Sequence, residues 1–142
     1  MEASRKYIDH TADILFQAEA STLPELFEQC ALAVENAQVV LKGIKAKESK
    51  EIKLENSTLE KLLFDFLDEL LYLKDTEGLI FSKFKCKIEE KNKKFLLNCT
   101  TKGEKFNPDK HEQKVDAKAI TMHMFKVEQI KDGWKAKVLV DI

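Results

Sequence analysis

The sequence is poor in glycine and proline, with four and two of them among 142 residues. The glycines are dispersed, whereas a phosphate-binding or dinucleotide-binding turn needs several glycines close together between a strand and a helix. A kinase, a GTPase or a dehydrogenase is therefore not expected, and the Gly-x-Ser-x-Gly elbow of serine hydrolases is also missing. No stretch rich in Gly, Pro or Ser divides the chain, so we expect residues 1–142 to form a single domain with its own core.

Cysteine is scarce as well, and Cys30, Cys86 and Cys99 lie far apart without a Cys-x-x-Cys pair or a nearby histidine. This spacing gives no zinc motif. Each of the three falls on the apolar side of a predicted helix or strand, where free cysteine usually packs as a small hydrophobic residue. We expect three reduced structural thiols, with a redox or thiol-catalytic role as the lesser alternative.

No charge of one sign dominates, because 24 Lys and Arg residues are balanced by 25 Asp and Glu residues. A balanced chain offers no strong field to a polyanion, so direct nucleic-acid binding is not expected. The apolar runs are too short to span a membrane, and the first residues do not resemble a secretion signal. We expect a cytoplasmic protein with no membrane contact.

Two segments carry clear helix signals. Thr22, followed by a proline in the first turn and by Glu25, predicts a helix start of the capping-box type, and the helical spacing ends before Gly43. Ser57 and Glu60 predict a second capping box, after which a wide stripe of leucine and phenylalanine continues to a glycine stop. Such a stripe is more typical of a core helix than of a partner-binding helix, because a small domain needs it to cover a sheet.

Strand patterns fill most of the remaining chain. Apolar residues alternate over residues 12–20, which places Asp13 near the start of a strand on its less apolar side. Asp132-Gly133 is a good hairpin signal near the end of the chain. Further strands are predicted over residues 47–54, 79–88, 95–101, 115–130 and 134–140, with a loop over residues 103–112. Together these elements predict an α+β fold: a two-layer domain in which a mostly antiparallel sheet of about six or seven strands packs against two main helices.

The most suggestive chemistry is divided between the two ends of the chain. The letters DHTAD occupy residues 9–13, and VDI occupies residues 140–142. If the fold brings these ends together, Asp13, Asp141 and the terminal carboxylate of Ile142 offer a hard cation an all-oxygen site. The alternative from the residues alone is that Asp13 caps a turn, Asp141 makes a surface ion pair and the terminus is solvated.

The three histidines allow more than one interpretation. His111 lies in a polar loop, and His123 lies within a predicted strand, where a histidine is most often packed or hydrogen-bonded. His10 follows Asp9 inside the acidic segment, so its ring could orient a carboxylate or contact a partner.

Four segments, taken together and in order, resemble the archease family. They are YIDHTADI at residues 7–14, LDELLY with DTEG at residues 67–72 and 75–78, AKAITMH at residues 117–123, and VLVDI at residues 138–142. Met122 stands where many members have tyrosine, and Leu15 stands where many have glycine.

The resemblance implies a function that the composition does not. Archeases are accessory proteins of the GTP-dependent RNA ligase that joins 3′-phosphate or 2′,3′-cyclic phosphate ends to 5′-hydroxyl ends in tRNA splicing and RNA repair. They promote guanylylation of the ligase and its multiple turnover, while the ligase performs the joining. The resemblance therefore implies an activator rather than an enzyme, with the ligase as its protein partner. A second implied role is that of a chaperone or specificity modulator of a tRNA methyltransferase.

The resemblance also implies a metal site formed by Asp13, Asp141 and Ile142. Its all-oxygen donors suit calcium or magnesium better than zinc, and waters or a partner must complete the shell. Asp9, His10 and His123 are expected to face the partner or to support the ligands. Two other hypotheses stay open: a stand-alone metal-dependent hydrolase, in which the cation activates water with Asp9 or His10 as the base, and a purely structural interaction module.

Overall fold

The computed structural model describes residues 1–9 and 12–142. In this part of the chain the elements follow the order β1 (Ser4–Ile8), β2 (Asp13–Ala20), α1 (Leu23–Gln38), η1 (Leu41–Gly43), β3 (Glu48–Asn56), α2 (Leu59–Glu77), β4 (Leu79–Lys91), β5 (Lys94–Lys105), β6 (Ala119–Ile130) and β7 (Gly133–Asp141). The predicted α+β class with two main helices is confirmed. The strands divide into two antiparallel sheets instead of forming one, a four-stranded sheet in the order β1-β2-β7-β6 and a three-stranded sheet in the order β3-β5-β4.

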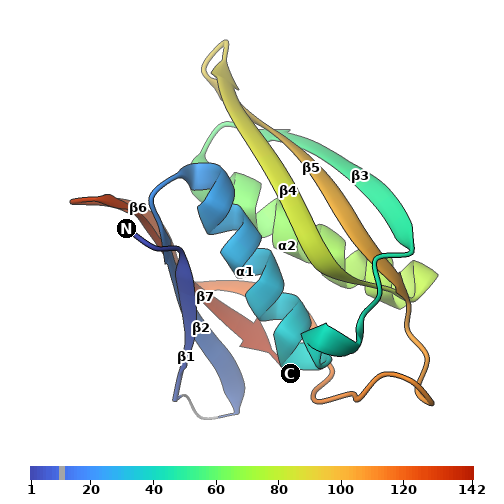
Figure 1. Cartoon of the computed structure of the whole chain (residues 1–142). Helices are drawn as coiled ribbons and strands as arrows, with labels where there is room; N and C mark the ends of the chain where they lie inside the picture. The colour runs from blue at the N-terminus through green and yellow to red at the C-terminus, as the bar shows by residue number, and fades with distance from the viewer. Residues whose placement is uncertain (10–11) are drawn as a thin grey trace.

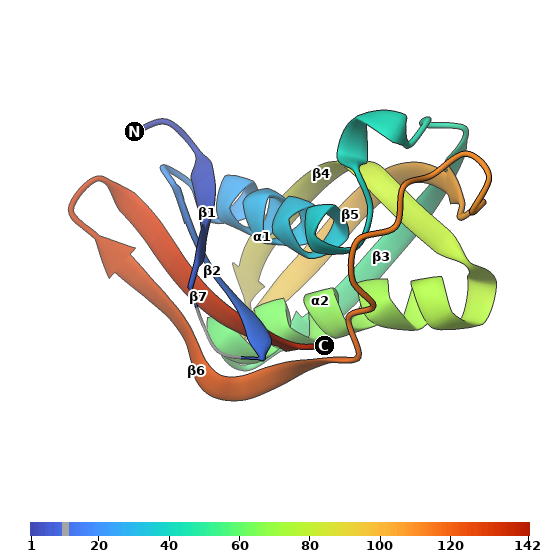
Figure 2. The ribbon, with the colours of Figure 1, turned by 90° about the horizontal axis from the view of Figure 1, so that it is seen from below.

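Both helices lie between the two sheets (Figures 1 and 2). Helix α1 packs against β4 of the smaller sheet and against β2 and β7 of the larger one, and α2 packs against β6 on one side and β3 and β4 on the other. The rings of Phe27 and Phe66 stack where the helices meet, with centroids 6.1 Å apart. One contiguous cluster of buried side chains includes residues of both helices and both sheets.

Local sequence explains how the helices begin and end. The Thr22 hydroxyl oxygen accepts the N–H of Glu25 and caps α1, as predicted. The predicted cap of α2 at Ser57 is wrong by one residue, because Thr58 Oγ1 accepts the N–H of Lys61 at 3.1 Å. Helix α2 ends at Gly78, whose φ of 68° lies in the left-handed region that glycine adopts without a steric penalty.

Helix α1 covers the free edge of β4 with two glutamates. Glu28 Oε2 accepts the N–H of Cys86 at 2.8 Å, and Glu35 Oε2 accepts the N–H of Phe81 at 3.3 Å. In a regular strand, two residues an odd number of positions apart point their N–H groups to opposite edges. The register shift between Phe81 and Lys83 changes this parity, so that both N–H groups face the helix.

Several boundaries differ from those predicted. Strand β1 was not predicted; it pairs with β2, and the Tyr7 hydroxyl donates to the Ala33 carbonyl at 2.8 Å. Strand β6 begins at Ala119 rather than at residue 115. Ile130 and Gly133 are paired, so the β6–β7 turn consists of residues 131–132, one position earlier than predicted. In the described part of the chain, no helix is both long and apolar enough to cross a membrane.

Candidate functional site

Asp13 and Asp141 come together at one end of the larger sheet. Asp13 is the first residue of β2, Asp141 is the last residue of β7, and the two are direct Cα partners in the antiparallel pairing. Directly opposed residues of antiparallel strands project to the same face, with Cβ atoms about 4.5–5.5 Å apart. The fold therefore presents two carboxylates side by side from the two ends of the chain.

Three contacts hold this end of β7. Asp141 is also paired with Ala119 of β6, and the Lys118 N–H donates to the Asp141 carbonyl oxygen at 2.8 Å. The Ile142 side chain packs against the main hydrophobic core. The Asp141 side chain is exposed while Asp13 is half-buried, so one carboxylate lies at the surface and the other just below it.

An apolar pair lies beside the two carboxylates on the same face. Leu15 and Leu139, two positions along each strand, are direct partners and are 4% and 3% exposed. The alternation of the sequence placed Leu15 on the less apolar side, and the structure buries it there. Charges beside buried apolar groups interact more strongly than charges surrounded by water. The two aspartates therefore lie next to a pair of buried apolar side chains.

His123 lies on a wide bulge of β6. Thr121 pairs with Leu139 and Lys126 pairs with Lys137, so the four residues 122–125 of β6 lie opposite the single residue Val138 of β7. The His123 side chain is exposed, as are Met122 and Met124, so the interpretation of His123 as a packed residue is wrong. Phe125, in contrast, is buried.

The bulge is fixed by packing and by an uncommon backbone conformation. The ring of Phe125 lies edge-on to Phe64 of α2, with centroids 5.8 Å apart. Met124 has a φ of 61°, which few residues other than glycine adopt. Bulges next to functional sites often aim particular side chains outward. Here the bulge displays Met122, His123 and Met124 close to the strand end that carries Asp141.

Asp9 and His10 are the remaining predicted positions. Asp9 follows β1 and is exposed. His10 lies outside the described residues, so its predicted role stays a prediction.

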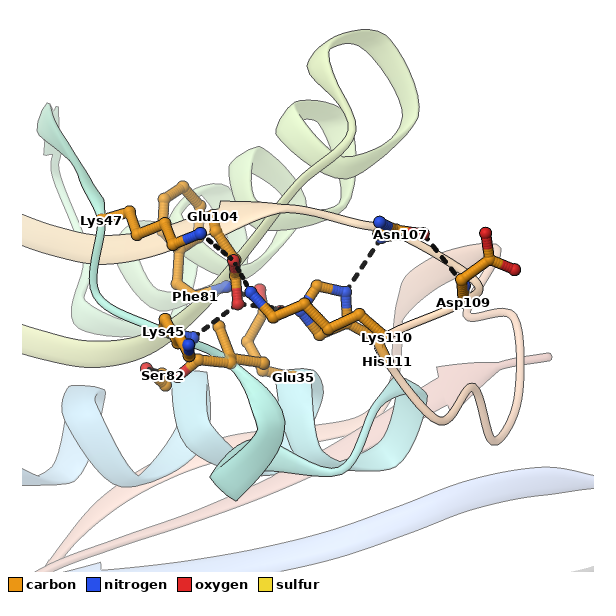
Figure 3. A network of polar contacts seen from close by, with 11 residues as sticks. Glu35, Lys45, Lys47, Phe81, Ser82, Glu104, Asn107, Asp109, Lys110 and His111 are labelled. Atoms are coloured by element: carbon orange, nitrogen blue, oxygen red, sulfur yellow. Dashed lines mark hydrogen bonds and ion pairs between the residues drawn. The ribbon is translucent and has the colours of Figure 1, made fainter.

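A second polar cluster, which the sequence did not indicate, surrounds Glu104 at the end of β5 (Figure 3). Its carboxylate accepts hydrogen bonds from Lys110 Nζ and from the Lys45 N–H, both at 2.6 Å, and lies 2.9 Å from His111 Nε2. Lys110, the Lys45 N–H and His111 lower the pKa of Glu104 to about 2. Glu104 is 5% exposed and His111 is 4% exposed, so this is a buried ionic cluster.

Both nitrogens of His111 are used within the fold. The Asn107 N–H donates to His111 Nδ1 at 2.9 Å, so the ring hydrogen is on Nε2 and points to Glu104. The ring also stacks on Phe106, with centroids 5.8 Å apart. Because neither nitrogen is left to take a proton from a substrate, His111 fastens the loop after β5 to the sheet. The sequence predicted a loop over residues 103–112 but not that it folds back onto the sheet.

Comparison with known proteins identifies the family of this chain. The model of the archease protein family matches residues 6–142. The chain belongs to the archease family. It is 46% identical over 138 residues to an archease of Pyrococcus furiosus, covering 96% of this chain and 97% of the relative. An archease of Methanosarcina acetivorans is 38% identical, with 96% and 94% covered.

Solved structures agree with this membership. A solution structure of a Methanobacterium thermoautotrophicum protein superposes with a TM-score of 0.87 at 36% identity, covering 97% of this chain and 98% of that one. A crystal structure from Thermotoga maritima, described as an archease and possible chaperone, superposes with a TM-score of 0.63 at 25% identity, with both chains fully covered.

The donor set of this archease fits part of a cation site. The opposed carboxylates of Asp13 and Asp141 are hard oxygen ligands of the kind that calcium and magnesium take. Among residues 1–9 and 12–142, no group of three or more His, Cys, Asp or Glu side chains is placed to hold a metal. The two aspartates therefore form an incomplete shell, and their role as ligands, with Ile142, stays a prediction.

Two hollows in the described part of the chain lie away from these aspartates. One of about 780 Å³ is formed mainly by lysine and polar side chains of β4 and β5, and one of about 500 Å³ lies beside Glu104 and Lys110. Neither is lined by Asp13 or Asp141.

Proposed function

We propose that this archease is an accessory protein of the GTP-dependent RNA ligase that joins 3′-phosphate or 2′,3′-cyclic phosphate ends to 5′-hydroxyl ends. It promotes guanylylation of the ligase and its multiple turnover in tRNA splicing and RNA repair. The ligase performs the joining, and the archease acts in the cytoplasm without catalysing a reaction of its own. The observation that carries the proposal is the direct opposition of Asp13 and Asp141 at a surface end of the larger sheet.

The proposed site holds calcium or magnesium through Asp13, Asp141 and Ile142. A bound cation supplies positive charge at a surface where the chain itself places two negative side chains. The incomplete shell leaves coordination positions for waters or for carboxylate or phosphate groups of the partner. The archease therefore contributes two aspartates that hold the cation, and the partner completes its surroundings.

The neighbouring bulge provides the contact surface for the ligase. Met122 and Met124 are 53% and 39% exposed, and exposed methionine adapts readily to a partner's shape. His123 between them, and Asp9 after β1, supply polar groups for the same partner. On this proposal the ligase contacts the nucleic acid, and the archease does not bind RNA directly.

The test is a guanylylation assay of the ligase with GTP and a limiting amount of archease. We expect Asp13→Ala and Asp141→Ala to reduce stimulation of guanylylation by at least tenfold while circular dichroism shows a folded protein. Asp132→Ala is the matched control, because Asp132 is exposed in the turn at the other end of the β6–β7 hairpin. Folded Asp13→Ala and Asp141→Ala variants that stimulate as well as the wild type would refute the proposal.

A second function is favoured by the exposed methionines and by the description of the Thermotoga maritima relative as a possible chaperone. In this alternative the same surface keeps a tRNA methyltransferase soluble or alters its specificity. Co-expression with the methyltransferase separates the two roles. An increase in soluble methyltransferase that is lost in a Met122→Ser/Met124→Ser variant, with no effect on ligase guanylylation, would favour the chaperone.

A further inference from the structure

Two cysteines face each other inside the smaller sheet. Cys86 of β4 and Cys99 of β5 are direct Cα partners, and both side chains are buried, at 6% and 0% exposed. Their Sγ atoms are 3.0 Å apart, with both residues present as free thiols. Residues that are 13 positions apart in the sequence thus bring two sulfur atoms into direct contact.

The hydrogen-bond pattern shows which kind of cross-strand pair this is. Opposed residues of antiparallel strands either exchange two backbone hydrogen bonds or exchange none. The Cys86 N–H donates to Glu28 Oε2 on α1, so it points away from β5 and Cys86–Cys99 is a non-hydrogen-bonded pair. Such pairs have the shorter Cα separation, about 4.5 Å, which lies inside the range of about 4.4–6.8 Å found for disulfides. The backbone is already placed for a covalent link.

We propose that Cys86 and Cys99 form an oxidisable dithiol, which a peroxide converts into a disulfide that joins β4 to β5. The Cys86 thiolate attacks one oxygen of hydrogen peroxide, giving a sulfenic acid and, after proton transfer, one water. The Cys99 sulfur then attacks the Cys86 sulfur and displaces the second water. The two thiols lose two electrons and two protons, and the peroxide takes up both to become two waters.

Burial sets the rate of this chemistry. The hydrogen bond to Cys99 and desolvation raise the pKa of the Cys86 thiol above its ordinary value. Because the thiolate is the reacting form, oxidation is slow at neutral pH and becomes faster as the pH rises. Cys86 lies on an edge strand under α1, so the helix must move aside briefly for the peroxide to enter.

The proposal is independent of the proposed ligase function. Cys86 and Cys99 belong to the β3-β5-β4 sheet, whereas Asp13 and Asp141 belong to the other sheet. The link closes a hairpin that is already formed, so the larger sheet keeps its register. Its main effect is to restrict the unfolded chain and thereby to stabilise the protein.

The experiment treats the folded, full-length protein with hydrogen peroxide at pH 7 and pH 9, removes the peroxide, and denatures the protein in the presence of a reagent that blocks the remaining thiols. Trypsin cleaves after Lys87 and Lys94, so it separates the two cysteines and a disulfide leaves their peptides joined. We expect the Cys86–Cys99 pair of peptides, with a mass lower by two hydrogen atoms and released by dithiothreitol, to form faster at pH 9. We also expect the thermal unfolding midpoint to rise by about 5–15 °C.

Two variants provide the controls. Cys30→Ala removes the remaining thiol, which is fully buried on α1, and it is expected to form the same linked peptides. Cys99→Ala leaves Cys86 without its opposing sulfur and is expected to gain neither the link nor the rise in the midpoint. The proposal is overturned if the folded wild type keeps both thiols, oxidises either one to a sulfinic or sulfonic acid without a link, or links Cys86 to Cys30.

Discussion

Glu35 on α1 accepts the backbone N–H of Phe81 on β4, with 3.3 Å between Oε2 and N, in a position that is fully buried. Its other carboxyl oxygen, Oε1, has no hydrogen-bond partner among the described residues. Burial raises the pKa of Glu35 to about 8, partly offset by the Phe81 N–H and by Lys74. Glu35 is therefore mostly protonated at neutral pH, and it covers a strand edge as a neutral group.

This position predicts an unusual pH dependence of stability. The folded protein holds the Glu35 proton up to a pH of about 8, whereas the unfolded chain releases it near 4.5. The unfolded state therefore binds fewer protons in this window, so the stabilisation that the Glu35 proton provides is fully present below pH 4.5 and falls by up to about 1.4 kcal/mol per pH unit toward pH 8. We expect Glu35→Gln, whose amide oxygen still accepts the Phe81 N–H, to remove most of this decline.

Urea unfolding at pH 5 and pH 8 measures the effect. Glu48→Gln is the matched control, because Glu48 is exposed at the start of β3 and should leave the decline unchanged. An equal decline in the wild type and in Glu35→Gln would contradict the assignment.

Glu104 predicts a pH dependence of stability that is opposite in sign to that of Glu35. Its folded pKa of about 2 lies below the ordinary value of 4.5, so the folded state prefers the charged form. The resulting stabilisation is present above pH 4.5 and is lost as the pH falls toward 2. We expect Glu104→Gln to lower the free energy of unfolding at pH 7 and to differ less from the wild type at pH 3. Urea unfolding at the two pH values tests this, with exposed Glu112→Gln as the control. A difference that does not shrink in acid would contradict it.

The features that were predicted correctly from the sequence depend on local signals or on a shared pattern. The residues that indicate the Thr22 cap and the apolar stripe of α2 lie close together in the sequence, within one or two helical turns of each other. The alternation of β2 fixed which residues face the core, and the family resemblance paired Asp13 with Asp141 before any register was known. These inferences needed no knowledge of how distant strands pair.

The features that were missed depend on long-range pairing. The helices lie between two groups of strands and so divide them into two sheets. The bulge at residues 122–125 appears only when β6 is aligned with β7. The contact of Glu104 with His111 depends on how the loop after β5 folds back. No periodicity of the sequence marks any of these positions.

The start of α2 offers a test at single-residue resolution. The pattern of Ser57 and Glu60 matches a capping box, yet it is Thr58 whose hydroxyl accepts the Lys61 N–H. We expect Thr58→Ala to lower the free energy of unfolding by about 0.5–2 kcal/mol, because one N–H at the helix start loses its acceptor. Ser57→Ala is the matched control and should change it by less than about 0.5 kcal/mol. Thermal unfolding that shows the larger loss for Ser57→Ala would contradict the observed cap.

The opposed aspartates are expected to destabilise the protein without a cation and to stabilise it when a cation is bound. Like charges directly opposite each other on antiparallel strands are destabilising. In the presence of a chelator, we therefore expect Asp141→Asn to raise the free energy of unfolding by about 0.2–1 kcal/mol. Calcium should then stabilise the wild type, by about 2.7 kcal/mol at one hundred times its dissociation constant, and should stabilise the variant far less. Chemical unfolding with chelator and with added calcium measures both effects, with Asp132→Asn as the control. Equal stabilisation of the wild type and Asp141→Asn by calcium would place the cation away from the β2–β7 strand end, because removing one of the three proposed carboxylate ligands must weaken a site that they share.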